Sequence, residues 1–445
     1  MNKLRHIVLQ AVIIAACCLI ANSFTWATTY YVATAGAGGS DANSCPTAQT
    51  DTTGKLTINA GISCLASGDT LQIKAGTYTA PTSAIPSGSD ANNRTKIESF
   101  QTDAVTVSGT VTAFNGRTWI WWDDINVNAA GQNESITTGG GTSHIKITNS
   151  RIYGAAAFGI LDSRDTGDTG DWEISDNLFD TIGTLYTHHG IYLSTANNVI
   201  EFNEFTAISG NCVQFYTGSA NQTDTSNSIA RFNNCHDTSG TDPVNGNGVA
   251  INAYNGTNIQ IYGNLFTNIG GTGTSNGCCG VINSAGLAPL IYNNTVTNSK
   301  PFALSLDGST NAVVKNNIFW DNCKETPCDY NHTEMPTNLM GTTPTRANNL
   351  CTTATTGCSV TTDPKFINAA ENNYQIQNTS PARDGGADLG SSFNTDYAGT
   401  TRPRGSAWDI GAYEHTGIKP NYYRRHRRGD IPSPAMPTIV SAEVQ

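Results

Sequence analysis

Long apolar runs are almost absent from this sequence of 445 residues. After residues 7–21, no stretch approaches the roughly 20 apolar residues that a helix needs to cross a bilayer. We therefore expect no membrane span in the mature chain. A zinc site is equally unexpected, because no spacing of Cys and His residues matches one.

Charge is also scarce, since Asp, Glu, Lys and Arg make up only 13% of the chain. The 35 acidic residues outnumber the 24 basic ones, and the net charge is -11. Two of the basic residues lie in residues 1–27 and five in residues 417–445, so the rest of the chain is strongly acidic. An acidic body argues against nucleic acid as a partner. Low charge with many Gly, Asn and Thr residues fits the surface of a β-solenoid.

The two ends of the chain differ in composition from the rest. Residues 1–27 combine a basic start, an apolar stretch and small residues before Ala27, which predicts a cleaved secretory signal peptide. Lipidation at Cys17 is the alternative. Residues 417–445 hold an arginine cluster and several prolines, which predict a mobile tail. We expect a secreted or cell-surface protein, extracellular or periplasmic, that acts as a monomer.

One short phrase recurs eight times between Ile120 and Phe319. It consists of an aliphatic residue, two arbitrary positions, Asn (or Asp or Ser), one arbitrary position and another apolar residue. The copies lie 23 to 31 residues apart, which suits one coil of a parallel β-helix. A single coil cannot bury its apolar side alone, so the coils must stack. The fourth positions of the copies are Asp123, Ser150, Asn177, Asn203, Asn233, Asn264, Asn294 and Asn317.

Stacking in register predicts columns of equivalent side chains. The Asn positions should form a ladder of amides at a turn, which is a structural rather than a catalytic role. One aliphatic column is expected from Ile147, Ile174, Ile200, Ile261 and Ile291, and one aromatic column from Phe179, Phe205, Phe266 and Phe319.

A second phrase falls between the copies and predicts another strand in each coil. Side chains alternate across a strand. The inward set is expected to be Ile191, Val213, Val249, Val281 and Leu304, and the outward set Tyr192, Gln214, Ala250, Ile282 and Ser305.

Ten cysteines follow the predicted signal, and an even number in an oxidising compartment predicts disulfides. The local pairs are Cys45 with Cys64, Cys323 with Cys328 and Cys351 with Cys358. Cys212, Cys235, Cys278 and Cys279 are harder to assign. Cys235 takes an inward Phe position and is interpreted as a buried thiol, whereas Cys278 and Cys279 are candidates for a vicinal disulfide.

Three stretches resemble secreted right-handed parallel β-helix proteins of the pectate-lyase-like superfamily. The first joins residues 29–33, 55–63 and 68–78, and is similar to the opening cap of that family, an amphipathic helix that feeds the first coil. The second is the set of repeats. The third, which ends in Asp-Ile-Gly-Ala-Tyr-Glu, is similar to the closing module of many exported β-helix proteins and joins residues 363–366, 380–386 and 409–414.

The resemblance implies an all-β fold, a right-handed parallel β-helix. We place the N-terminal cap and first coils at residues 28–104, the β-helix repeats at residues 105–322 and the C-terminal closing region at residues 323–416. Members of this superfamily are commonly polysaccharide lyases, hydrolases or uronate epimerases, and others only bind. The fold alone therefore does not name a reaction.

A polyuronate lyase must neutralise a carboxylate with Ca²⁺ or a cationic side chain, and then remove the C5 proton with a base. His189, at the entry to a central strand, is one candidate base, and Lys300, just before another strand, is the second. Arg164 follows a strand end and is the candidate cation. An ordinary surface or loop role is the alternative for each of them.

Ca²⁺ is the one cofactor that the sequence suggests. Asp165, Asp168 and Asp171 lie on a Gly-punctuated loop and are candidate metal ligands. Their spacing differs from an EF-hand, and no counterpart of the aspartate cluster that binds calcium in pectate lyases is evident. An acidic turn without metal is the alternative, and pectate cleavage specifically is in doubt.

Asp237, Asp242 and Asp307 are candidates for the paired carboxylates of a glycoside hydrolase. The close set of strand aspartates typical of β-helix polygalacturonases is not evident, so a hydrolase ranks below a lyase.

Aromatic, amide and carboxylate side chains near the outward strand face predict a glycan groove. We predict a lyase-like enzyme acting on extracellular polysaccharide, with a noncatalytic glycan-binding surface protein as the alternative. The acidic body favours a neutral or metal-bridged glycan. Ordinary enrichment of Tyr on β surfaces is the competing explanation. The predicted substrate-binding residues are Tyr192, Gln214, Tyr216, Asn252, Asp307 and His188.

Overall fold

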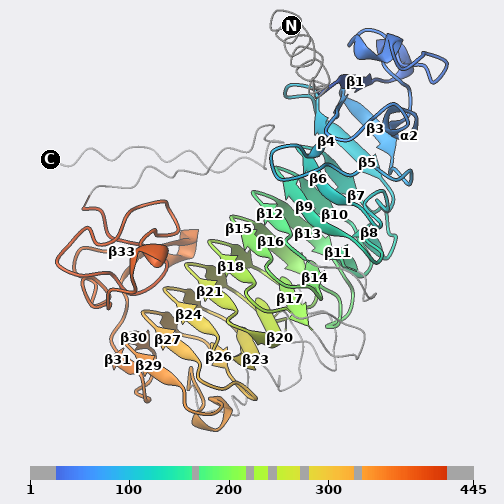
Figure 1. Ribbon diagram of the computed structural model, residues 1–445. Helices are drawn as coiled ribbons and strands as arrows, with labels where there is room; N and C mark the ends of the chain where they lie inside the picture. Colours follow the sequence, from blue (N-terminus) through green and yellow to red (C-terminus); the bar gives the residue numbers. More distant parts are fainter. Residues whose placement is uncertain are drawn as a thin grey trace, which may run out of the picture.

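The computed structural model describes residues 27–162, 170–216, 225–238, 248–270, 280–324 and 333–417. Within these residues the chain winds into stacked coils whose strands form parallel sheets (Figure 1). The predicted right-handed parallel β-helix is confirmed. No helix in the described ranges is long and apolar enough to cross a membrane. The helices are α2 (Ile58–Ile62), η1 (Ala35–Ala37), η2 (Thr47–Gln49), η3 (Thr337–Leu339), η4 (Ala369–Glu371) and η5 (Ser391–Phe393).

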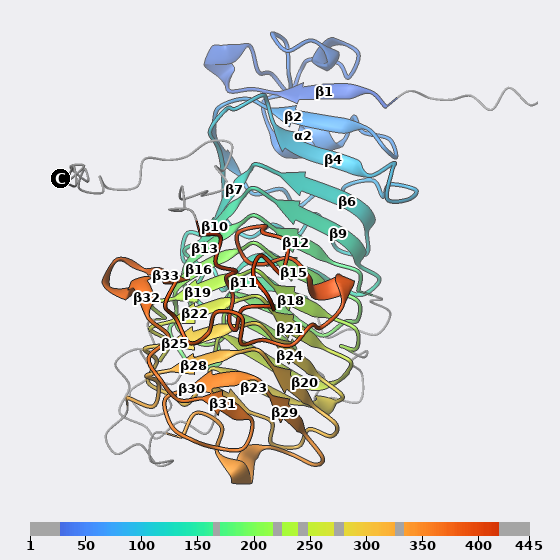
Figure 2. The same cartoon turned by 90° about the vertical axis from the view of Figure 1, so that its left-hand side faces the viewer.

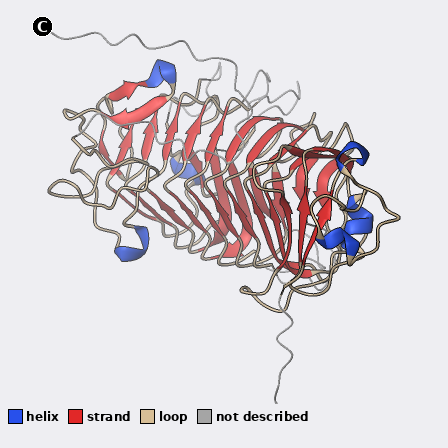
Figure 3. Cartoon of the chain, turned by 90° about the horizontal axis from the view of Figure 1, so that it is seen from above, coloured by secondary structure: helices blue, strands red, loops and turns tan. Residues whose placement is uncertain are grey.

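Three parallel sheets, here called A, B and C, run along the solenoid axis, and Figure 3 shows their strands stacked in rows. Sheet A contains β1 (Thr29–Val32), β2 (Thr70–Ile73), β4 (Thr95–Ser99), β6 (Thr118–Asp123), β9 (Ser143–Thr148), β12 (Glu173–Ser175), β15 (Val199–Glu201), β18 (Ile229–Arg231), β21 (Gln260–Tyr262), β24 (Leu290–Tyr292), β27 (Val313–Lys315) and β29 (Thr345–Ala347). Sheet B contains β3 (Gly76–Thr79), β5 (Val105–Ser108), β7 (Asn126–Asn128), β10 (Arg151–Tyr153), β13 (Leu178–Ile182), β16 (Glu204–Ile208), β19 (Asn234–His236), β22 (Leu265–Thr267), β25 (Thr295–Thr297), β28 (Ile318–Trp320), β30 (Asn349–Cys351) and β31 (Cys358–Val360). Sheet C contains β8 (Glu134–Thr137), β11 (Phe158–Leu161), β14 (Ile191–Leu193), β17 (Val213–Tyr216), β20 (Ile251–Thr257), β23 (Ile282–Leu287) and β26 (Leu304–Ser305). An antiparallel hairpin pairs β32 (Phe366–Asn368) with β33 (Asn373–Ile376).

The corner between sheets A and B holds the predicted asparagine ladder. The backbone and side-chain nitrogens of Asn203, for example, both donate to the Oδ1 of Asn233 over 3.1 Å. The residue before each ladder asparagine has a left-handed φ between 51° and 65°, which turns the chain from one sheet into the next. The ladder extends one coil further than predicted and comprises Asn177, Asn203, Asn233, Asn264, Asn294, Asn317 and Asn349, all buried.

The inward columns of sheets A and B match the prediction for most coils. The five predicted isoleucines share one register, and the four predicted phenylalanines share another. The first copy is shifted by two residues, because Trp122 rather than Ile120 pairs with Ile147. Ile125 therefore takes the corner position that the sequence assigned to Asp123. Ile120 and Trp122 are both apolar and face the same side of the strand, so either residue fits the first position of the repeated phrase.

Sheet C shows a similar correction. Ile191 and Val213 are in register with Ile251 and Ile282, so the predicted register, which aligned them with Val249 and Val281, is wrong. Val249 and Val281 are nevertheless buried, and Val281 belongs to the core. Ile282 faces the core instead of solvent and is 0% exposed. Val281 and Ile282 are consecutive apolar residues, so the sequence does not show which of them occupies the inward position of the strand. Only the pairing with neighbouring strands decides it.

The disulfides test three of the cysteine predictions. The local pairs Cys45–Cys64 and Cys351–Cys358 are confirmed. Cys212 bonds with Cys235, so the interpretation of Cys235 as a free buried thiol is wrong. This disulfide joins the start of β17 to β19, directly beside sheet C. Cys323 is also disulfide-bonded, whereas Cys328, Cys278 and Cys279 lie outside the described residues.

The two ends of the described chain cover different surfaces. α2 places Ile58 and Ile62 in the core at the N-terminal end of the solenoid. Near the C-terminus the chain returns along the outside of sheet A (Figure 2), where the Phe393 ring lies 5.0 Å from that of Tyr262. In this returning segment the Arg402 guanidinium donates over 3.0 Å to the Glu414 carboxylate, and both side chains are 0% exposed. The segment also packs Ile410 against Ile318 of sheet B, so it is attached to sheets A and B.

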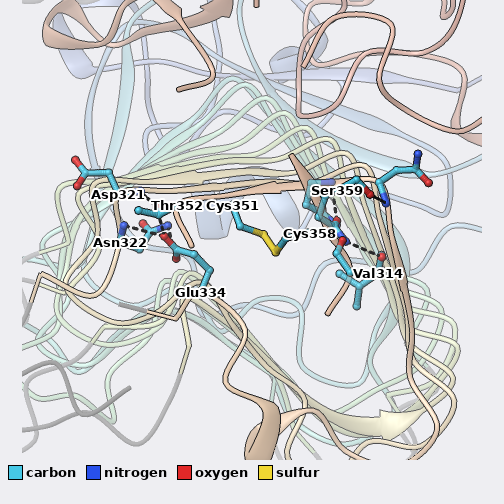
Figure 4. Close-up of a disulfide and its surroundings, with 12 residues drawn as sticks. Val314, Asp321, Asn322, Glu334, Cys351, Thr352, Cys358 and Ser359 are labelled. Atoms are coloured by element: carbon cyan, nitrogen blue, oxygen red, sulfur yellow. Dashed lines mark hydrogen bonds between the residues drawn. A yellow bond between two sulfur atoms is a disulfide. The ribbon is translucent and has the colours of Figure 1, made fainter. Parts of the chain in front are cut away.

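A shorter polar ladder lies at the corner between sheets B and C, and it ends at a buried carboxylate. Asn322 donates from its backbone and side-chain nitrogens to Glu334 over 3.2 and 3.0 Å, and the Thr352 hydroxyl donates over 2.7 Å (Figure 4). Glu334 is 0% exposed. Burial raises the pKa of its carboxyl to about 7.

The asparagine ladder makes a stability prediction. Asn233→Ala leaves the backbone N–H of Asn203 without its acceptor in the core, and such an orphaned group costs roughly 1–3 kcal/mol. Asn115, an exposed turn residue, supplies the control, because Asn115→Ala should change the free energy of unfolding by less than about 0.5 kcal/mol. Denaturant unfolding of both variants measures the effect. Equal destabilisation by the two substitutions would contradict it.

Glu334 makes a pH prediction. Because its pKa rises from 4.5 to about 7 on folding, the stability from its neutral form is complete below pH 4.5 and is lost as pH rises through about 7. Glu334→Gln should abolish this loss. The drop in unfolding free energy between about pH 5 and about pH 8 should then be roughly 1–3 kcal/mol smaller than in the unmodified protein. The prediction fails if chemical denaturation gives both proteins the same pH dependence.

Candidate functional site

Sheet C is the least charged of the three sheets. Its seven strands contain one charged residue, Glu134 in β8, and no Lys, Arg or His. Sheet A, by contrast, carries Lys96, Lys146 and Arg231 on its strands, all in ion pairs with carboxylates. The polar chemistry of sheet C is therefore that of amides and hydroxyls.

An amide ladder runs along the outward face of sheet C. Tyr192, Gln214, Asn252 and Asn283 occupy equivalent outward positions on β14, β17, β20 and β23. Asn283 donates to Asn252 over 2.8 Å, and Asn252 donates to the Gln214 Oε1 over 3.1 Å. Asn211, at the turn before β17, donates to the same oxygen over 2.5 Å. The hydrogen bonds fix these side chains as a pre-formed polar row.

Tyrosine rings lie beside this amide ladder. Tyr216 and Tyr254 are in register two positions further along their strands, with ring centroids 5.3 Å apart. The Tyr192 ring lies 6.2 Å from that of Tyr216, although Tyr192 belongs to the amide column. Tyr254 is 39% exposed and Tyr192 only 2%. The predicted outward facing of Tyr192 is confirmed by its register, and its burial shows that neighbouring groups cover it.

The two predicted histidines lie in the turn between β13 and β14. The buried His189 ring stacks parallel to Tyr192 at 5.7 Å, and its Nδ1 accepts a hydrogen bond of 3.1 Å from the Asn211 backbone. The Nδ1 of His188 accepts from the backbone nitrogens of Thr184 and Leu185 over 3.0 and 3.2 Å. Burial lowers the pKa of His188 below its ordinary value of 6.5.

Lys300 and Asp307 lie far from these histidines. Lys300 belongs to the turn between β25 and β26, and exposed Asp307 follows β26. β26 is four strand positions from β14 in sheet C. At roughly 4.8 Å per spacing, this places Lys300 about 19 Å along the axis from His189. The structure therefore does not bring the two candidate bases together.

The remaining predicted site residues lie mostly outside the described ranges. Arg164, Asp165 and Asp168 are among the residues that the structure does not describe. Asp171 precedes β12, and its carboxylate lies 3.8 Å from the Nδ1 of His144. Within the described ranges, no group of three His, Cys, Asp or Glu side chains is arranged to hold a metal ion.

A row of aromatic and charged side chains on sheet A was not foreseen from the sequence. The Lys96 ammonium lies 3.7 Å from the centroid of the Trp121 ring, and Lys146 lies 5.3 Å from the same ring. The Trp119 ring stacks on His144 at 3.8 Å. Because the lysines also pair with carboxylates, this row fits a stabilising role between coils that precede the first ladder asparagine.

Sequence reasoning also missed two members of the amide ladder. Asn283 was hidden by the incorrect facing of Ile282. Asn211 precedes its strand and reaches Gln214 through the turn. Once the coils are correctly registered, an amide stands at the same outward position in three consecutive coils, and this repetition identifies the row.

Comparison with solved structures finds the same fold. The crystal structure of pectate lyase Pel9A superimposes with a TM-score of 0.53 and 14% identity, covering 87% of this chain and 96% of that one. A lacto-N-biosidase from Eubacterium ramulus gives a TM-score of 0.46 at 11% identity, covering 72% of this chain and 67% of the other. A rhamnogalacturonan lyase gives 0.45 at 12% identity, covering 79% and 95%. The first similarity shows the β-helix fold, and the other two are too distant to carry an argument. No protein-family model and no curated protein matches the sequence.

The bonding of His188 makes a prediction about local exchange. Protonation below its lowered pKa removes the acceptor of the Thr184 and Leu185 amides. These two hydrogen bonds therefore stabilise the turn at neutral pH, and the stabilisation is lost as pH falls through the pKa of His188. Hydrogen exchange of these two amides, corrected for the intrinsic pH dependence, should accelerate roughly tenfold for each 1.4 kcal/mol lost, whereas the Gly183 amide, which donates to Ala155, should not change. Parallel behaviour of all three amides would contradict this role of His188.

Proposed function

We propose that this protein, as an exported monomer, binds an extracellular polysaccharide along the outward face of sheet C. One observation carries the proposal: a row of tyrosine rings lies beside a hydrogen-bonded amide ladder on one sheet face. Aromatic rings pack on the C–H faces of sugars, and amides exchange hydrogen bonds with sugar hydroxyls. A solved structure with the same fold is a pectate lyase, so this architecture is compatible with a polysaccharide ligand.

Export is part of the proposal. Three disulfides join described cysteines, which fits an oxidising compartment. Residues 1–27 have the composition of a secretory signal. A protein with both features meets glycans of the cell exterior rather than cytoplasmic metabolites.

Lyase-type elimination is the second candidate function, because His189 lies on this face in ring contact with Tyr192. The backbone N–H of Asn211 donates to the Nδ1 of His189, so the neutral ring carries its proton on Nε2. To accept a C5 proton at Nδ1, the ring must give up this hydrogen bond. Lys300 is too far along the axis to act at the same sugar. Binding is therefore better supported than elimination, and Ca²⁺ held at Asp171 with Asp165 and Asp168 belongs to the second candidate only.

The binding proposal predicts a role for the exposed tyrosine. Tyr254→Ala removes one stacking ring and should weaken binding roughly 2- to 10-fold, because such contacts contribute about 0.5–1.5 kcal/mol. Tyr153→Ala is the matched control, since Tyr153 lies on sheet B beside Arg151. Affinity electrophoresis of the mature protein in gels containing single polysaccharides measures both variants.

The same polysaccharide panel separates the two candidates. Retention in a gel with unchanged polymer supports binding, and new absorbance from an unsaturated sugar, with or without Ca²⁺, supports elimination. If Tyr153→Ala weakens retention as much as Tyr254→Ala, sheet C is not the binding face. If neither retention nor product is seen with any neutral or acidic glycan, the proposed function is wrong.

A further inference from the structure

Charge is divided unequally between the faces of the solenoid. The outward side chains of sheets A and B form ion pairs at successive coils, such as Lys146 with Glu173 and Arg151 with Asp180. Sheet C has no cationic residue on any of its seven strands, and its single carboxylate is on the first strand. The same coils contribute strands to all three sheets, yet only the strands of sheet C lack cationic residues. An anionic ligand on sheet C would therefore meet no ion-pairing partner from its strands.

The exposed apolar side chains are concentrated near the same sheet. Six large apolar residues in the described ranges are markedly exposed, and four of these belong to sheet C or to the turn that leads into β14. Exposed apolar groups next to a polar row suit a ligand with C–H faces and hydroxyl edges. The four are Leu185 (47%), Tyr186 (43%), Tyr254 (39%) and Leu287 (48%).

The amide ladder is polarised along the axis. Asn283 donates to Asn252 and Asn252 donates to Gln214, so the side-chain nitrogens point toward the N-terminal coils. Among the described residues, no hydrogen bond reaches the Nε2 of Gln214 or the Oδ1 of Asn283. The row thus ends in a donor on one coil and in an acceptor two coils away. A hydroxyl can serve both ends, whereas an ionised carboxylate or sulfate only accepts and is repelled by the Asn283 oxygen.

We propose that sheet C selects an uncharged, hydroxyl-rich glycan and discriminates against polyuronates and sulfated glycans. This inference rests on the proposed function and adds its substrate class. The three observations that carry it are the lack of cationic strand residues, the exposed apolar flank and the open donor and acceptor of the ladder. The net charge of -11 acts in the same direction, because it disfavours the approach of a polyanion.

Matched polymers that differ only in charge test the inference. Fully methyl-esterified galacturonan is compared with the same polymer after de-esterification, and desulfated galactan with its sulfated form, each with and without Ca²⁺. The neutral member of at least one pair should bind at least roughly tenfold more tightly at low salt. Tighter binding of the charged members would overturn the inference and leave polysaccharide binding intact. Binding to neither member of any pair, nor to the wider panel, would overturn the proposed function itself.

A variant that introduces a positive charge provides an independent test of charge selectivity. Asn283→Lys places one cation at the open acceptor end of the ladder and should raise affinity for the de-esterified polymer roughly fivefold. Ser175→Lys places the same charge on β12 of sheet A and serves as the control. An increase with Asn283→Lys alone supports sheet C as the face that sets charge selectivity. Equal increases with both variants, or an increase with neither, overturn this assignment.

Discussion

The fold depends on a buried polar contact that repeats from coil to coil, in which one asparagine Oδ1 accepts from two nitrogens of the asparagine in the coil before it. A buried corner of backbone and amide groups is tolerated only when its donors are satisfied. This requirement holds the coils in register at the turn from sheet A to sheet B. The hydrophobic columns then follow, because a slip of one residue would turn an apolar row outward.

Fixed register also creates the outer surface. Tyr216 of one coil lies over Tyr254 of the next, and Gln214 lies over Asn252, although 38 residues separate each pair in the chain. The Cys212–Cys235 disulfide and the hydrogen bond from the Asn211 backbone to His189 hold the turns beside this face. The candidate site is therefore a repeated row rather than a single cluster, which suits a polymer more than a small ligand.

Parts of sheets A and B are covered by contacts within the protein. On sheet A, Phe232, Tyr262 and Tyr292 pack against the returning C-terminal segment, which is tied internally by the buried Arg402–Glu414 pair. Near the N-terminus of sheet A, lysines and tryptophans contact one another between coils. These rows, although aromatic, face neighbours in the same chain. The aromatic row of sheet C differs in having an exposed member, Tyr254, and an uncharged setting.

The sequence alone determined the solenoid, because the repeat of apolar and Asn positions has only one way to bury its apolar side. It also predicted Tyr192, Gln214 and Tyr216 on one face, because alternate residues of a strand point to opposite sides of the sheet. The repeat already placed the strands that follow His189 and Lys300 four coils apart, and the structure has the same number. It failed at Ile120 and at Val281, where apolar neighbours allow two registers, and so it missed Asn283. Tertiary structure decided these points, because pairing with both neighbouring strands admits a single register.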